Sequence, residues 1–142
     1  MEGHPVRVFR VKVTFDPLGR SPTITLQGAL TNGGSLAVPQ GLHMIFFELE
    51  TIHTPEGDEA TFPVYPIEWV NPEETSTVPP PECFQTQWHD QRRFTLVVFN
   101  SFQQIPDVPD NNRYAFNVVV FHKGRTYGTD PTIILEPPGL PP

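Results

Sequence analysis

Five histidines and one cysteine are the residues of this chain that could bind a transition metal or act as a nucleophile. They are His4, His43, His53, Cys83, His89 and His122. No two of them have the short spacing of a zinc knuckle or of an H-E-x-x-H helix, although distant strands can bring such ligands together. Cys83 follows three prolines and has no glycine turn or helix N-terminus beside it to activate the thiol. The sequence therefore predicts no metal, no cofactor and no catalytic residue. A metal-dependent β-barrel enzyme stays as the least favoured alternative.

Carboxylates gather in three places. The segment 107–112 and the group Glu56, Asp58 and Glu59 offer the hard oxygen ligands that calcium prefers. Neither follows a calcium-loop pattern, and Asp and Asn are also common turn formers, so both are interpreted as turns. Strand carboxylates, which could form a glycosidase pair, are Glu48, Glu50 and Glu68. They are interpreted as a solvated strand face.

Aromatic side chains offer a different chemistry, the stacking of sugar rings. Trp69, Trp88 and Tyr65 are the candidate ligand-binding residues, since planar rings on a sheet face suit a carbohydrate. The competing interpretation makes the two tryptophans core residues, because large aromatic rings bury much area in any sandwich.

The elements that must position these residues are strands. Eighteen prolines separate short runs in which Val, Ile, Phe and Thr alternate with polar residues. Proline breaks helices and is tolerated at turns and sheet edges, and no segment has a 3.6-residue period. We expect an all-β chain with about eight or nine strands.

Two strands carry specific expectations. Val6 and Val8 are out of phase with Val11, Val13 and Phe15, which predicts a β-bulge near residues 9–10. In the segment 42–52, one face is apolar throughout, whereas the other begins with Met44 and Phe46 and becomes Glu48 and Glu50. This pattern predicts a central strand that is covered on both faces at its start.

Strands of this number and spacing predict a single-domain antiparallel β-sandwich over residues 1–136, immunoglobulin-like in general arrangement. A jelly-roll or a small β-barrel is the alternative. Residues 137–142 form a separate proline-rich C-terminal tail.

Composition narrows the classes of partner. The 142 residues carry a net charge of −7, and the nine basic residues are scattered, which argues against nucleic acid. A lone cysteine excludes an intrachain disulfide and, with no signal peptide in the given chain, favours a cytoplasmic protein. No apolar run approaches the length of a membrane span, so no membrane insertion is expected.

Assembly is the function that this composition favours. Proline-rich segments are pre-ordered and lose little entropy when a partner docks against them. The candidate assembly contacts are Pro79, Pro80, Pro81, Pro137, Pro138 and Leu140. The sequence therefore predicts a non-catalytic binding or self-assembling structural module whose partner is protein, first of all another copy of itself. A small-ligand or carbohydrate-binding sandwich is the alternative.

Overall fold

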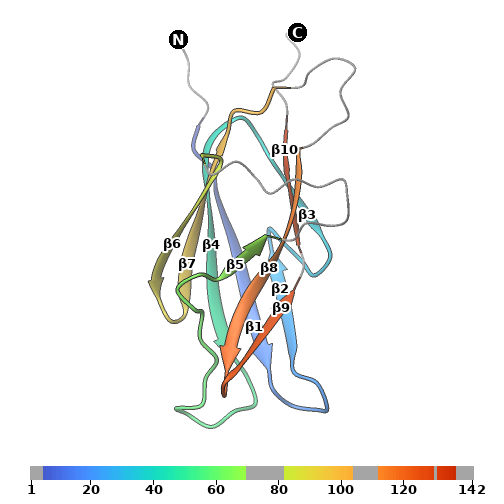
Figure 1. Cartoon of the computed structure of the whole chain (residues 1–142), viewed down its shortest axis with the longest axis vertical. Helices are drawn as coiled ribbons and strands as arrows, with labels where there is room; N and C mark the ends of the chain where they lie inside the picture. Colours follow the sequence, from blue (N-terminus) through green and yellow to red (C-terminus); the bar gives the residue numbers. More distant parts are fainter. Residues whose placement is uncertain (1–4, 70–81, 104–111, 130, 137–142) are drawn as a thin grey trace.

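Two β-sheets packed face to face form the structure (Figure 1). A computed structural model of the chain describes residues 5–69, 82–103, 112–129 and 131–136. Over these residues there is no helix, and there are ten strands. They are β1 (Val8–Asp16), β2 (Thr23–Gly28), β3 (Ser35–Val38), β4 (Gly41–Thr51), β5 (Ile67–Trp69), β6 (Phe84–Asp90), β7 (Arg93–Asn100), β8 (Arg113–His122), β9 (Arg125–Thr129) and β10 (Thr132–Leu135). The predicted all-β sandwich is confirmed.

The first sheet, sheet A, has the strand order β2-β1-β4-β7-β6, and sheet B has the order β3-β10-β8-β5 with β9 beside β8. Both sheets end in distinct edge strands, so they are not closed into a barrel. The expectation of purely antiparallel pairing is corrected, because β1 pairs in parallel with β4 and β3 pairs in parallel with β10. The chain reaches β4 from β1 only after passing through β2 and β3, which supplies the long crossover that a parallel pair requires.

Strand β1 has no bulge near residues 9–10, so the β-bulge predicted there from the sequence is wrong. Its register against β4 runs without a shift from Val8 to Phe15. Phe9, Val11, Val13 and Phe15 face inward, and Val8 lies on the outer face with 49% of its surface exposed. The apparent change of phase in the sequence thus comes from an outward-facing valine.

Strands β9 and β10 continue one another along the same side of β8. Val118 pairs with Thr129 and Ala115 pairs with Thr132. The two pairs are three positions apart along both strands, so the register is kept. The N–H of Phe116 donates to the carbonyl of Pro131 at 3.1 Å. Proline has no N–H to return a bond, which explains why the strand is interrupted there.

The core lies between the sheets and consists mainly of aromatic and β-branched side chains. Phe47 of β4 is stacked on Phe94 of β7 with ring centroids 4.4 Å apart, and Phe62 meets Phe94 edge-on at 4.7 Å. Phe116 of β8 is fully buried on the sheet B side. This inner packing fixes which face of every strand points outward.

Candidate functional site

The histidines that the structure describes act as structural hydrogen-bonding groups. His43 is 1% exposed; its Nδ1 accepts from the backbone N–H of Arg7 at 3.0 Å, and its Nε2 donates to the carbonyl of Gln40 at 2.8 Å. The Nε2 atom of His122 lies 2.8 Å from the carbonyl of Asp58. Because both ring nitrogens of His43 are engaged, this ring offers no lone pair to a metal. Within the described residues, no three His, Cys, Asp or Glu side chains form a metal-binding group.

His89 and His53 also have protein partners. The Nε2 of His89 lies 2.7 Å from Oγ1 of Thr95, and the Nδ1 of His53 lies 3.3 Å from Asp16. His4 and residues 107–111, from the segment interpreted as a turn rather than a calcium loop, lie outside the described residues.

Cys83 is a buried residue beside β6. It is 9% exposed, and burial raises the pKa of its thiol. A raised pKa keeps the thiol protonated at neutral pH, which makes it a poor nucleophile.

The three aromatic candidates lie in different environments. Trp69 is half-buried and packs on Phe84 and Phe116, with ring centroids 4.7 and 5.4 Å apart. Tyr65 is 85% exposed in the loop before β5. Trp88 is 39% exposed, and its Nε1 donates to the carbonyl of Phe62 at 3.2 Å. Trp69 therefore packs at the edge of the hydrophobic core. No contact between the rings of these three residues is among the aromatic contacts of the described residues.

The prolines proposed as assembly contacts lie outside the described residues. This applies to Pro79, Pro80, Pro81, Pro137, Pro138 and Leu140, and to the tail 137–142 as a whole.

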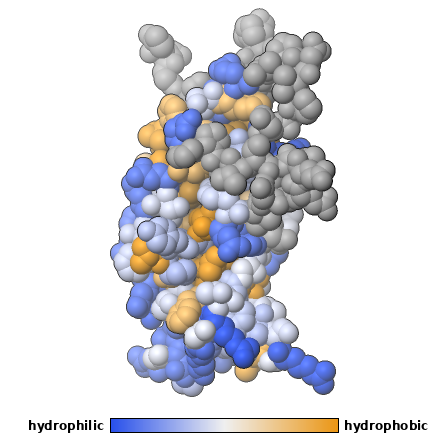
Figure 2. Space-filling model, viewed as in Figure 1, coloured by the Kyte–Doolittle hydropathy of each residue, from blue (hydrophilic) through white to orange (hydrophobic). Residues whose placement is uncertain are grey.

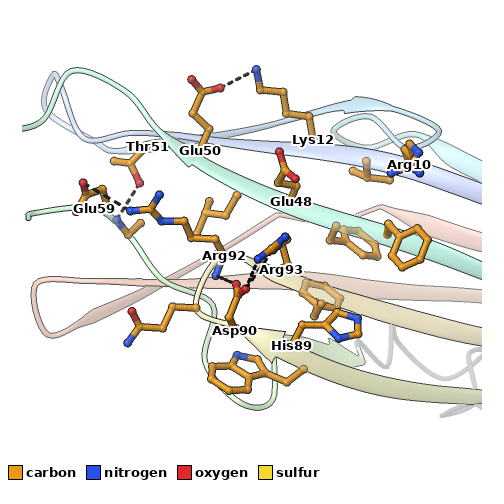
Figure 3. A pocket seen from close by; sticks show the side chains of 18 residues that line it. Arg10, Lys12, Glu48, Glu50, Thr51, Glu59, His89, Asp90, Arg92 and Arg93 are labelled. Carbon is orange, nitrogen blue, oxygen red and sulfur yellow. Dashed lines mark hydrogen bonds and ion pairs between the residues drawn. The ribbon is translucent and has the colours of Figure 1, made fainter. Parts of the chain in front are cut away.

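Charged side chains surround a shallow hollow on the outer face of sheet A, with a volume of about 1600 Å³ (Figure 3). The Nζ of Lys12 lies 2.6 Å from Glu50, and Arg93 binds Asp90 through Nε and Nη2 at 3.0 and 2.7 Å. Four basic residues (Arg10, Lys12, Arg92 and Arg93) face four acidic ones (Glu48, Glu50, Glu59 and Asp90). These charges balance, so the lining of the hollow has no net charge at neutral pH.

Two of the predicted strand carboxylates, Glu48 and Glu50, lie in this hollow on β4. The cross-strand neighbours of Glu48 are basic, Lys12 on one side and Arg93 on the other, and Glu50 forms an ion pair with the same Lys12. Glu68 lies on β5 of the other sheet, where Asn117 donates to it at 3.2 Å. The three carboxylates therefore do not converge.

Next to the hollow, six apolar side chains cover the other half of the same outer face. We call them the outer apolar patch: Val8, Leu42, Met44, Phe46, Val97 and Phe99. Val8 pairs with Met44, Met44 with Val97, and Leu42 with Phe99, so the six are neighbours across three strands. Leu42 is 40% and Phe99 47% exposed. The guanidinium of Arg10 lies over the Phe46 ring at 5.5 Å and marks the boundary with the hollow.

This patch corrects the expectation that β4 is covered on both faces at its start. Inward-facing residues of β4 are buried, but Leu42 is exposed and Met44 and Phe46 are only half-buried. The described part of the chain places no second layer over them. Sequence reasoning found the apolar residues and assigned them to the interior, because hydrophobicity alone does not distinguish a covered face from an uncovered one.

The outer edge of β6 is a third feature of sheet A, at the left margin of Figure 1. No described strand pairs with it, and residues Phe84 to Trp88 include neither a charge nor a proline. The sequence showed an uncharged segment with an aromatic residue at each end, Phe84 and Trp88. It did not show that this strand lies at the edge of a sheet.

A scan against protein-family models gave no match, and a search of curated proteins gave no significant relative. Over the residues that the structure describes, no helix is long and apolar enough to cross a membrane.

Proposed function

We propose that this chain is a non-catalytic structural module that associates with protein, first of all with other copies of itself. The observation that carries the proposal is the outer edge of β6, with which no described strand pairs and whose segment Phe84 to Trp88 has no charge or proline. An edge strand presents unpaired N–H and C=O groups that can pair with another chain, and proteins usually protect such edges with charges, prolines, short strands or covering groups.

Among the described strands there are four other edge strands. Three of them, β2, β3 and β5, are protected in these ways, and the fourth, β9, has five residues and begins with the charged Arg125. At β2, the Asn32 side chain accepts from the N–H of Leu26 at 2.7 Å and donates to the carbonyl of Ile24 at 2.6 Å. It thereby satisfies two of the backbone groups that β2 directs away from β1. β3 has only four residues and β5 only three. By contrast, β6 has seven residues, and those from Phe84 to Trp88 are uncharged.

The outer apolar patch gives independent support for a protein partner. From strand spacing of ~4.8 Å and ~6.8 Å per outward residue, its six residues cover roughly 200 Å² of the sheet plane. A stable interface buries about 800 Å² per partner, so the patch alone supports only weak association. In Figure 2, hydrophobic residues are also exposed among hydrophilic ones in the middle of the face in view.

One observation favours a second candidate function, carbohydrate binding. Of the three aromatic candidates, only Trp88 lines the charged hollow, where paired carboxylates and guanidinium groups could bind hydroxyls beside a stacked ring. Titration with sugars would change the tryptophan fluorescence of wild type but not that of Trp88→Phe, in which only Trp69 remains. An unchanged spectrum with a panel of mono- and oligosaccharides would rule this candidate out.

Light scattering coupled to size exclusion tests the first proposal. Over a hundredfold concentration range, we expect the mass to rise above the 16.0 kDa of one chain. A mass of 16.0 kDa at every concentration would contradict self-association and leave only a different protein as partner.

A further inference from the structure

We infer that β6 of one copy pairs antiparallel with β6 of a second copy, about a two-fold axis that passes beside Thr86. This inference rests on the proposed self-association and names its contact. It comes from two observations on β6, the direction of its free backbone groups and the order of its side chains.

The backbone groups of alternate residues of β6 point away from the sheet. The N–H of Phe99 donates to the carbonyl of Cys83 at 2.8 Å, and these two residues continue the β6–β7 register in which Gln85 faces Val97 and Gln87 faces Thr95. In an antiparallel pair, hydrogen-bonded and non-hydrogen-bonded positions alternate. Gln85 and Gln87 therefore bond to β7, whereas Phe84, Thr86 and Trp88 direct their N–H and C=O groups outward.

The side chains of β6 have the order aromatic, Gln, Thr, Gln, aromatic from Phe84 to Trp88. This order is the same in both directions. Antiparallel pairing centred on Thr86 places Phe84 opposite Trp88 of the second copy, Gln85 opposite Gln87, and Thr86 opposite Thr86. Every residue then faces one of its own chemical kind, and no like charges meet.

The two observations select the same register. With the axis at Thr86, all three outward-directed residues pair, which gives about six backbone hydrogen bonds between the copies. Moving the axis by one residue, to Gln85, leaves about four such bonds within this segment. The register shift between Trp88 and Asp90 in the β6–β7 pairing ends the regular strand where the symmetric segment ends.

The paired strands join the two copies of sheet A into one continuous sheet. In Figure 1, the side of β6 that faces away from β7 has no described strand beyond it. The outer apolar patch lies on the sheet face and takes no part in this contact, so edge and face can be tested separately.

Thr86→Pro tests the pairing while sparing the fold. The N–H of Thr86 is not used by β7, and proline is tolerated on an edge strand when its N–H position faces solvent. We expect a chain folded as wild type, by near-ultraviolet circular dichroism and urea melts, that dimerises at least about tenfold more weakly, since some backbone bonds are lost. Thr86→Val, which keeps the N–H, should dimerise as wild type does. Gln87→Pro, which removes a bond to β7, should lower the stability of the fold.

Cysteine cross-linking tests the register independently of stability. In a Cys83→Ala background, Thr86→Cys should give a disulfide-linked dimer under mild oxidation, because residues opposite each other lie about 5.5 Å apart between Cα atoms. Gln85→Cys is the matched control. Its symmetry mate lies about 8 Å away, beyond the ~7 Å limit for a disulfide, so it should stay monomeric on a non-reducing gel.

The results of these experiments distinguish pairing through β6 from self-association through another surface. If Thr86→Pro associates like wild type while Phe99→Lys does not, the copies meet through the outer apolar patch, and pairing through β6 is wrong. Cross-linking of Gln85→Cys in place of Thr86→Cys would also overturn it. A wild-type chain that is monomeric at all concentrations contradicts both.

Discussion

Phe47 and Phe116 are buried on opposite sides of the core, at 1% and 0% exposure. Replacing either by Ala removes most of a ring and leaves a cavity between the sheets. We expect each substitution to lower the free energy of unfolding by about 3–5 kcal/mol in urea melts. Phe99→Ala, on the exposed face of β7, is the control and should cost much less. A loss below about 1 kcal/mol for Phe47→Ala would contradict the inward assignment of β4.

Asp90 has a pH-dependent contribution to stability. The guanidinium of Arg93, followed by the backbone N–H of Arg92 at 2.8 Å, holds the pKa of this carboxyl below its ordinary value of 3.8. A lowered pKa stabilises the fold above the pKa of the unfolded chain, and this contribution is lost as the pH falls through the folded value. Asp90→Asn should therefore be less stable than wild type near pH 6, and the difference should shrink towards about pH 2. Urea melts across that range measure it, and a difference independent of pH would contradict the ion pair's role.

At the scale of single residues, the sequence indicated the role of some side chains but not which other residues they contact. Cys83 could be interpreted as a structural thiol from its neighbours alone. The contact of Trp69 with Phe116 depends on the pairing of β5 with β8, and its contact with Phe84 depends on how the two sheets stack. No local pattern encodes either contact. The same holds for the ring nitrogens of His43, whose partners Arg7 and Gln40 meet only in the folded chain.

Between elements, Asn100 joins the end of β7 to both β3 and the residue after β10. Its Nδ2 donates to the carbonyls of Val38 and Glu136, each at 2.8 Å, and its Oδ1 accepts from the N–H of Phe102 at 3.0 Å. Asn100→Ala removes these three hydrogen bonds. The carbonyls of Val38 and Glu136 keep one bond each, from the N–H of Glu136 and from the side chain of Gln40, so we expect a loss of about 1–3 kcal/mol in the free energy of unfolding.

Gln103→Ala is the matched control for Asn100→Ala, because Gln103 is exposed nearby. It should change stability by no more than about 0.5 kcal/mol. Equal effects of the two substitutions would mean that Asn100 does not connect the sheets.

The strands themselves were largely predictable, because proline and period-two alternation are local signals. The strand expected at 42–52 is β4, Gly41–Thr51, and the one expected at 132–135 is β10. Parallel pairing of β1 with β4 was not predictable, since register between distant segments depends on which faces are buried. The bulge expected in β1 failed for the same reason, because an exposed valine looks like a core valine in the sequence.

For the whole molecule, the central question is which surface meets a partner. Sequence composition predicted association and assigned it to proline-rich segments. The structure adds two surfaces of sheet A, the outer apolar patch and the free edge of β6, and only a sheet order could reveal that β6 is an edge. If β6 mediates assembly, the contact is made by hydrogen bonds of the backbone and should depend little on salt, because the segment has no charge.

Amide hydrogen exchange at Thr86 is the most direct test of assembly through β6. Gln87, whose N–H is directed to β7, should be protected at every protein concentration. The Thr86 N–H is directed away from β7, and no described strand lies on that side. We therefore expect fast exchange in dilute protein and strong protection at high concentration, rising together with the mass measured by light scattering. Fast exchange at Thr86 at concentrations where the mass has doubled would contradict pairing through this edge.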